Sequence, residues 1–286
     1  MPPWRMDSAI ASPSPAVSSA LPIGPLLRGL RERQRLSQMA LALHTGVSQR
    51  HLSCLETGKA LPSRAMLLAL LDALRTPLAE RNQALLAAGF APHYPSRGWE
   101  DEGLLAVRTS LRDFLRAHEP APTMLLDAGW NVLETNAAVP ALMRLIGYTP
   151  PAVADGMPLN LLEMLLLPGG LLACAVNGPE VAQAVRQRAQ AEAVFNPALA
   201  ARLRALPGMG SSPSPARPAP APQGPVLLMQ LRSSAGILAF MSAFTTLASP
   251  LDVALDSLRM DHLLPADDRT RQALQAALAA AAPPLT

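Results

Sequence analysis

The chain contains little cysteine. Its 286 residues include two cysteines, Cys54 and Cys174, which are too few for a disulfide framework or a closed metal site. We therefore expect a protein of the reducing cytoplasm that holds no metal. Long apolar runs are missing too: the most apolar stretch, 159–176, is interrupted by Glu163 and Pro168 and is too short to span a bilayer. No apolar segment follows a basic start, so we expect neither a signal peptide nor a membrane span.

Motifs of known catalytic chemistry are also absent. The sequence contains no glycine-rich phosphate loop, GxSxG, HExxH or CxxC, and its five histidines have no carboxylate or cysteine partner at catalytic spacing. His51 and Cys54 lie three residues apart, so a metal or redox switch is one hypothesis, but no further ligand follows in register. Cys54 is better explained as a small core residue. We predict that the protein is not an enzyme and needs no cofactor.

Charge is unevenly distributed along the chain. The net charge is +3, yet residues 21–90 alone carry nine basic and four acidic residues, a surplus of +5. Such a surplus suits a phosphate backbone, although a solvated basic surface gives the same count. Half of the residues are apolar, and the length is enough for two domains with their own cores.

The most informative stretch is 36–58, LSQMALALHTGVSQRHLSCLETG. Ser37 and Ser48 are good N-caps for two short helices, and Gly46 can adopt the positive φ that a tight turn between them requires. Ala42 is small where the helices must approach, and apolar residues face one core: Val47, Leu52 and Leu55. The spacing predicts a helix-turn-helix whose second helix, 49–56, begins with polar side chains, at the end that enters a major groove.

Three side chains on this second helix are candidate base readers. Gln49 can bond an adenine edge bidentately, Arg50 can bond guanine, and Ser53 lies one turn on. Surface polarity alone is the competing explanation for Gln49 and Arg50. Phosphate contacts are expected from Gln38, Thr57, Lys59 and nearby backbone amides. The predicted DNA-binding residues are Gln38, Ser48, Gln49, Arg50, Ser53, Thr57 and Lys59.

The remaining patterns predict an all-α five-helix domain followed by an α+β domain. Amphipathic helices are expected at 23–34, 64–74 and 77–88 around the helix-turn-helix. After a helix at 102–118, whose broad apolar stripe suits a neighbouring domain or subunit, alternating segments predict strands at 123–127, 130–135, 225–232, 236–247 and 257–263. Between them, helices are expected at 137–146, 160–167, 178–193 and 197–206. The predicted boundaries are a disordered tail at 1–20, a DNA-binding domain at 21–90, a linker at 91–101 and a second domain at 102–282 with a Pro-rich loop at 207–224.

Two parts of the chain resemble known families. The stretch LLRGLRERQRLSQMALALHTGVSQRHLSCLETGKALPSRAMLLAL resembles the Xre, or lambda-repressor-like, DNA-binding domains. Later phrases resemble the MmyB-like transcriptional regulators, which have a PAS-like ligand-binding domain: RNQALLAAGFAP, AHEPAPTMLLDAGWNVLETNAA, LNLLEMLLLPGG and FTTLASPLDVALDSLRMDHLLPADDRTRQAL. Many members carry Asn-Trp-Glu where this chain has Asn177, Gly178, Pro179 and Glu180, so one pocket wall departs from the pattern.

The resemblance implies a small antiparallel sheet with helices over one face and a sensor cavity between them. Nine apolar positions are candidates to line it: Met124, Leu126, Trp130, Met143, Leu162, Leu166, Met229, Phe240 and Phe244. A solid hydrophobic core is the alternative for each. Asn136, Asn177 and Arg232 are polar groups that could orient a ligand, although Asn136 is more simply a helix cap. The family implies a small ligand, fatty-acid-like or otherwise amphipathic.

Together these features predict a cytoplasmic transcription regulator, a homodimer that binds a double-stranded palindromic operator and senses a small molecule. The alternative is an adaptor, such as an antitoxin or a phage-repressor partner, whose second domain binds a protein. A small molecule retained through purification would favour the sensor, and a stable hetero-complex would favour the adaptor.

Overall fold

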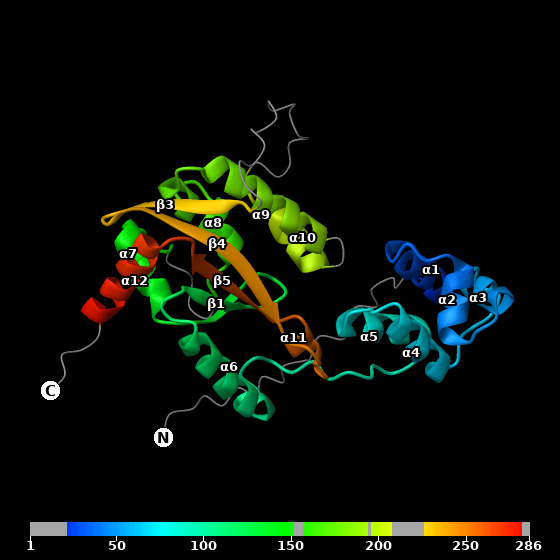
Figure 1. The fold of residues 1–286 in the computed structure, drawn as a ribbon. Coiled ribbons are helices and arrows are strands. Elements are labelled where there is room, and N and C mark those ends of the chain that lie inside the picture. The colour runs from blue at the N-terminus through cyan, green and yellow to red at the C-terminus, as the bar shows by residue number, and fades with distance from the viewer. Residues whose placement is uncertain (1–21, 152–156, 194–195, 208–225, 282–286) are drawn as a thin grey trace, which may run out of the picture. The chain divides into compact units, whose positions relative to one another are not determined.

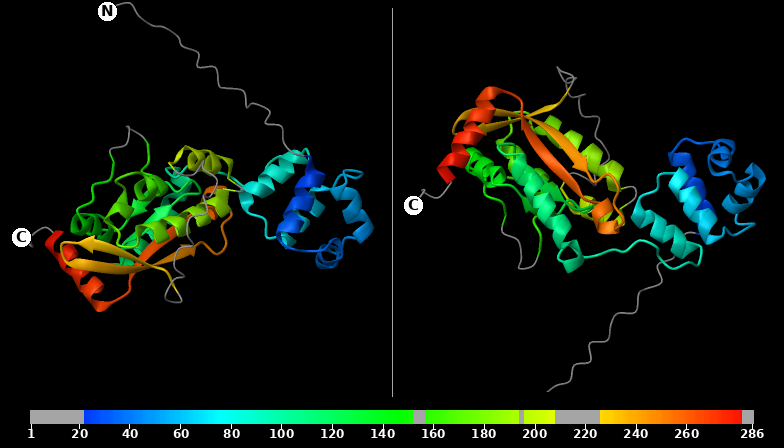
Figure 2. Two further views of the ribbon diagram at one scale, coloured as in Figure 1. Left: turned by 90° about the horizontal axis from the view of Figure 1, so that it is seen from above. Right: turned by 60° about the horizontal axis from the view of Figure 1, so that its bottom comes forward.

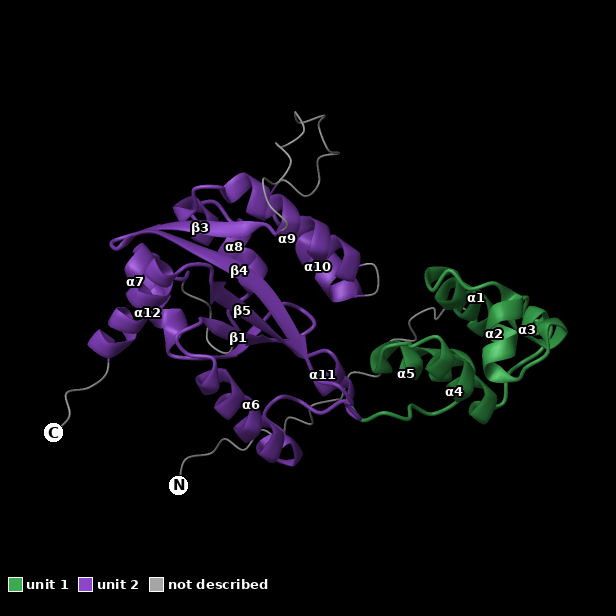
Figure 3. Ribbon diagram, viewed as in Figure 1, with its two compact units in different colours: residues 1–95 green, residues 96–286 purple. Residues whose placement is uncertain are grey.

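The computed structural model describes residues 22–151, 157–193, 196–207 and 226–281. It divides into two compact units, residues 1–95 and 96–286 (Figure 3). The predicted tail at 1–20, and all but the first residue of the predicted loop at 207–224, lie outside the described residues.

The first unit is all-α, as predicted. Residues 22–95, all of which are described, form five helices: α1 (Ile23–Arg33), α2 (Gln38–Thr45), α3 (Gln49–Glu56), α4 (Arg64–Ala73) and α5 (Leu78–Ala87). Their shared core is almost entirely leucine. Ser37, Ser48 and Ser63 each accept a hydrogen bond from a backbone N–H in the first turn of α2, α3 and α4. Gly46 ends α2 with a φ of 69°, the left-handed conformation that the turn requires.

The segment predicted as a linker, 91–101, is held at both ends. The side-chain oxygen of Asn82 accepts hydrogen bonds from the backbone N–H groups of His93 and Tyr94, so this part stays with the first unit. Arg97 forms an ion pair with Asp252 at 3.1 Å within the second unit. The division between the units therefore falls at residues 95 and 96.

The second unit is α+β and contains a five-stranded antiparallel sheet in the order β2-β1-β5-β4-β3 (Figure 1). Its strands are β1 (Thr123–Leu126), β2 (Val132–Thr135), β3 (Leu228–Ser233), β4 (Gly236–Thr246) and β5 (Arg259–Pro265). Its helices are η1 (Glu102–Leu104), α6 (Leu105–Ala117), α7 (Ala138–Ile146), α8 (Leu161–Leu166), η2 (Leu171–Cys174), α9 (Gly178–Ala193), α10 (Pro197–Ala205), α11 (Val253–Asp256) and α12 (Asp268–Ala281).

Helices cover both faces of this sheet, whereas one covered face was predicted. Met124 of β1 joins the core shared with α7, α8 and α9, while its neighbour Leu125 points the other way and packs with Leu111 and Leu115 of α6. Successive strand residues alternate between faces, so α6 must lie on the face opposite α8 and α9, as the views in Figure 2 show. The buried stripe of α6 thus packs on the sheet of its own unit, whereas the sequence predicted a neighbouring domain or subunit as its partner.

Three local predictions were wrong in detail. The second strand was expected from residue 130, but β2 begins at Val132, because the turn extends through Trp130 with a φ of 65°. The last strand was expected from residue 257, but α11 precedes it and β5 begins at Arg259. Asn136 does not cap α7: its side-chain oxygen accepts from the Thr123 N–H at 3.1 Å, and its amide donates to the carbonyls of Leu115 and Ala121.

Candidate functional site

The polar surface of α3 begins directly after its cap. Gln49 and Arg50 are exposed and Ser53 is half-buried, while Leu52 and Leu55 on the other side of the helix are fully buried. The hydroxyl of Ser48 accepts from the His51 N–H at 3.2 Å. One side of α3 is therefore buried in the core, and its N-terminal end exposes the long hydrogen-bonding side chains of Gln49 and Arg50.

A buried ion pair fixes α3 against α1 and α2. Arg31 Nε donates to Glu56 Oε1 at 2.6 Å, and Gln38 Nε2 donates to Glu56 Oε2 at 2.8 Å. Burial alone would raise the pKa of Glu56, but the hydrogen bonds from Arg31 and Gln38 and the positive charge of Arg31 outweigh it, so the pKa is lowered. Glu56 thus stays ionised and holds the Gln38 side chain at the start of α2.

The C-terminal end of α3 contains the other predicted DNA-binding residues. Thr57 and Lys59 are both exposed, and the Thr57 hydroxyl donates to the Ser53 carbonyl at 2.8 Å. Cys54 is half-buried and is not part of the leucine core, contrary to the core position predicted for it. Among the residues that the structure describes, no group of three or more His, Cys, Asp or Glu is placed to hold a metal ion.

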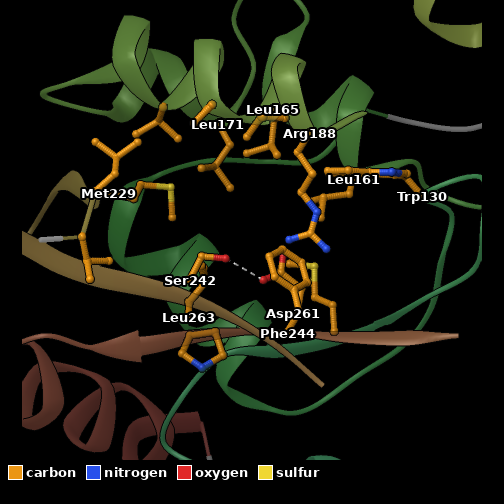
Figure 4. Close-up of a pocket in the computed structure, with 17 residues that line it drawn as sticks. Trp130, Leu161, Leu165, Leu171, Arg188, Met229, Ser242, Phe244, Asp261 and Leu263 are labelled. Atoms are coloured by element: carbon orange, nitrogen blue, oxygen red, sulfur yellow. Dashed lines mark hydrogen bonds between the residues drawn. The ribbon is translucent and has the colours of Figure 1, made fainter. Parts of the chain in front are cut away.

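In the second unit a pocket of about 300 Å³ lies between the sheet and helices α8 and α9 (Figure 4). Its lining is mostly apolar and comes from the sheet, from η2, α8 and α9, and from adjoining turns: Pro122, Met124, Trp130, Leu161, Leu165, Leu171, Val181, Ala184, Val185, Val226, Leu227, Met229, Phe244 and Leu263, with the polar Arg188, Ser242 and Asp261. An apolar cavity of this size with a few convergent polar groups is typical of small-molecule sites.

The polar residues gather at one end of the pocket. Ser242 Oγ donates to Asp261 Oδ1 at 3.0 Å, and the Arg188 guanidinium lies over the Phe244 ring, with its Cζ 3.1 Å from the ring centroid. Arg188 Nε also donates to Glu192 at 2.9 Å. Burial raises the pKa of the Asp261 carboxyl to about 6, although the Ser242 hydrogen bond and the charges of Arg188 and Arg259 limit the rise.

Trp130 forms the rim of this polar end. Its Nε1 donates to Glu192 Oε2 at 2.8 Å, and Arg259 lies over its ring at 4.2 Å from the centroid. The turn that places it is fixed by Asp127, whose carboxylate accepts from the N–H groups of Gly129 and Asn131. The left-handed backbone of Trp130, unusual for a bulky residue, directs its ring into the domain.

Comparison with protein families matches a family described as "Helix-turn-helix domain" to residues 23–84 and one described as "MmyB-like transcription regulator ligand binding domain" to residues 107–277. The second match spans more than half of the chain. The chain belongs to the MmyB-like transcription regulators.

Other comparisons add little to this assignment. No curated protein matches the regulator. Among solved structures it is similar to one described as "Structure of an RNA-binding Light-Oxygen-Voltage Receptor", with 14% identity and a TM-score of 0.25. The match covers 90% of this chain and 64% of that chain, and at such a score the likeness carries no argument.

In this MmyB-like regulator, four of the nine predicted positions line the pocket: Met124, Trp130, Met229 and Phe244. The other five belong to the solid core instead: Leu126, Met143, Leu162, Leu166 and Phe240. On α8 the reason is helical periodicity, because Leu161 and Leu165 face the pocket and the residues that follow each of them are turned away.

The polar ligand contacts expected in the regulator are also placed elsewhere. Asn177 bonds the backbone of β3, and Arg232 donates to the Ala175 carbonyl at 2.7 Å, so neither lines the pocket. Three polar lining residues were not predicted from the sequence: Arg188, Ser242 and Asp261. The signal available for the last two was the alternation of the strands, which puts Ser242 on the same face as Phe244 and Asp261 on the same face as Leu263.

Proposed function

We propose that this MmyB-like regulator binds a DNA operator through α3 and responds to a small amphipathic ligand held in the pocket of its second unit. The observation that carries the sensor role is the apolar pocket of about 300 Å³ with Arg188, Ser242 and Asp261 at one end. A hydrocarbon chain fits the apolar part and a polar head group fits the other end, which describes a fatty-acid-like or other amphipathic molecule.

In the DNA-binding role, Gln49, Arg50 and Ser53 read base edges and the residues around them hold the phosphate backbone: Gln38, Ser48, Thr57 and Lys59. The exposure of Gln49 and Arg50 beside a fully buried Leu52 supports this role. A homodimer in the cytoplasm would place two α3 helices on half-sites about one helical turn apart. Ligand binding would then change operator affinity through a coupling free energy of about 1–3 kcal/mol.

The test is fluorescence anisotropy with a labelled fragment from upstream of the gene, at two salt concentrations. We expect Arg50→Ala to relax sequence preference at one base position, at a cost of about 1–3 kcal/mol there. Arg28→Ala is the matched control, since it removes an exposed arginine of α1 and should leave sequence preference intact. Weak binding in the wild type that Arg50→Ala leaves unchanged would argue against the operator role and for the adaptor.

Denaturing mass spectrometry of the purified protein tests the sensor role independently. A co-purifying small amphiphile supports it, and a stoichiometric protein partner in its place contradicts it.

A further inference from the structure

Four charged side chains surround the polar end of the pocket. Arg188 and Glu192 lie one turn apart on α9, and Arg259 and Asp261 lie on the same face of β5. Glu192 accepts hydrogen bonds from Arg188 Nε at 2.9 Å and from Arg259 Nη1 at 2.6 Å. Two guanidinium groups and two carboxylates therefore balance one another before any ligand enters.

Two of the four side chains, Arg188 and Asp261, line the pocket, and both have hydrogen-bonding capacity that the described residues leave unused. Ser242 satisfies one oxygen of Asp261, and the other has no hydrogen-bond partner among the residues described. Arg188 uses its Nε for Glu192, and its two Nη groups have no hydrogen-bond partner in the same part of the chain. Figure 4 shows both side chains directed toward the cavity from opposite walls, with Phe244 beside Asp261 on the sheet. The pocket thus offers a donor and an acceptor close together.

The charge balance decides which head group fits best. A ligand carboxylate could accept from Arg188, but it would bring a third negative charge next to the buried Asp261 carboxylate, where solvent screens the repulsion weakly. An uncharged head group with both an acceptor and a donor satisfies Arg188 and Asp261 together and leaves the cluster neutral. Unsatisfied polar groups in such a site are costly, so the binding free energies of the uncharged ligand and the carboxylate should differ greatly.

We propose that the pocket selects an amphiphile whose uncharged head group carries both an acceptor for Arg188 and a donor for Asp261, as a primary amide does, over the matching carboxylate. This inference rests on the proposed ligand-binding function. Its consequence is that a carboxylate binds well only when Asp261 is protonated. The charged groups that act on Asp261 are Arg188 from α9 and Arg259 from its own strand, both paired with Glu192 of α9. The adjoining residues on β1 and β4, Met124 and Phe244, are uncharged.

The experiment compares decanamide with decanoate by isothermal titration calorimetry on the full chain, from about pH 8 down to about pH 6.5. We expect the amide to bind at least about tenfold more tightly at pH 8 and to show little pH dependence. The affinity for decanoate should rise about tenfold per pH unit as the pH falls, since each bound anion then takes up one proton. These wild-type measurements test the proposal without any variant.

Asp261→Asn provides the second test, because it removes the negative charge and offers a donor in its place. We expect it to improve decanoate binding at pH 8 and to remove the pH dependence. The control is Asp113→Asn, at an exposed residue of α6 outside the pocket, which should behave as the wild type.

Two failures are distinguishable. If both probes bind but decanoate is preferred at pH 8, with no response to Asp261→Asn, the head-group inference is overturned and the pocket remains a ligand site. If neither probe binds at any pH, the proposed sensor function is overturned and this inference with it.

Discussion

Glu56 links three helices of the DNA-binding unit through a single carboxylate. Its side chain is 2% exposed, and it accepts from Arg31 on α1 and from Gln38 at the start of α2. A buried ion pair adds little stability compared with apolar residues of the same shape, but removing one partner leaves a buried charge without compensation. The position is therefore sensitive to any change of charge.

We expect Glu56→Ala to lower the free energy of unfolding by about 3–5 kcal/mol, as measured by urea unfolding near pH 7. Because the folded-state pKa of Glu56 is lowered, its contribution is complete above the ordinary glutamate pKa of about 4.3 and is lost as the pH falls through the lowered value. The difference between variant and wild type should therefore shrink in acid.

Glu32→Ala is the control for this prediction, because Glu32 is a half-exposed glutamate that pairs with Arg28 on the same helix. Glu32→Ala should change the free energy of unfolding by no more than about 0.5 kcal/mol. If both variants lose the same free energy of unfolding, burial of the pair between Glu56 and Arg31 does not increase its effect on stability.

At the residue scale, the sequence indicated the chemistry of the DNA-binding surface better than that of the pocket. Gln49 and Arg50 follow a cap whose position sequence can predict, so their exposure follows from local periodicity. Asp261 and Arg188 meet only because β5 and α9, far apart in the chain, pack on each other. No local pattern encodes that contact.

Helix α1 approaches α3 closely at Gly24. A Cβ there would lie 2.7 Å from the Leu55 carbonyl oxygen and 2.8 Å from that of Glu56, both backbone atoms. Five residues along the same helix, Gly29 is exposed and has no atom within 4 Å of such a Cβ. One helix thus contains two glycines with opposite structural roles.

We expect Gly24→Ala and Gly29→Ala to change stability in opposite directions. The first must push α1 away from α3 and should destabilise the unit by about 1–3 kcal/mol. The second replaces a flexible helix residue and should stabilise it by about 0.5–1 kcal/mol. Thermal unfolding followed by circular dichroism measures both. A neutral or stabilising Gly24→Ala would contradict the close helix contact described here.

Element positions were predictable wherever a cap or a clear period marks them. The serine caps of α2, α3 and α4 are explicit in the sequence, and all five helices of the first unit were predicted. The strand pattern failed at Trp130, since a large aromatic residue favours a strand locally while Asp127 closes a turn around it. It failed again before β5, where Asp252 caps the short helix α11.

At the scale of the whole molecule, each buried cluster draws its residues from one unit. The leucine core contains residues 23–90, and the two clusters on either face of the sheet contain residues 99–274. No helix among the described residues is long and apolar enough to cross a membrane. Each unit therefore has a core of its own, as a unit that folds separately requires.

The separation into two cores gives the last prediction. A pocket-filling amphiphile should change the operator affinity of the full chain by about 5–150-fold, the range that coupling of about 1–3 kcal/mol allows, and should leave the affinity of residues 1–95 alone unchanged. Mixing residues 1–95 with residues 96–286 as separate chains should not restore the response. Anisotropy titrations with and without decanamide measure all three cases. If the operator affinity of residues 1–95 alone also changes, the amphiphile acts directly on the DNA-binding helices. If the affinity of the full chain does not change although the pocket is filled, ligand binding does not regulate DNA binding.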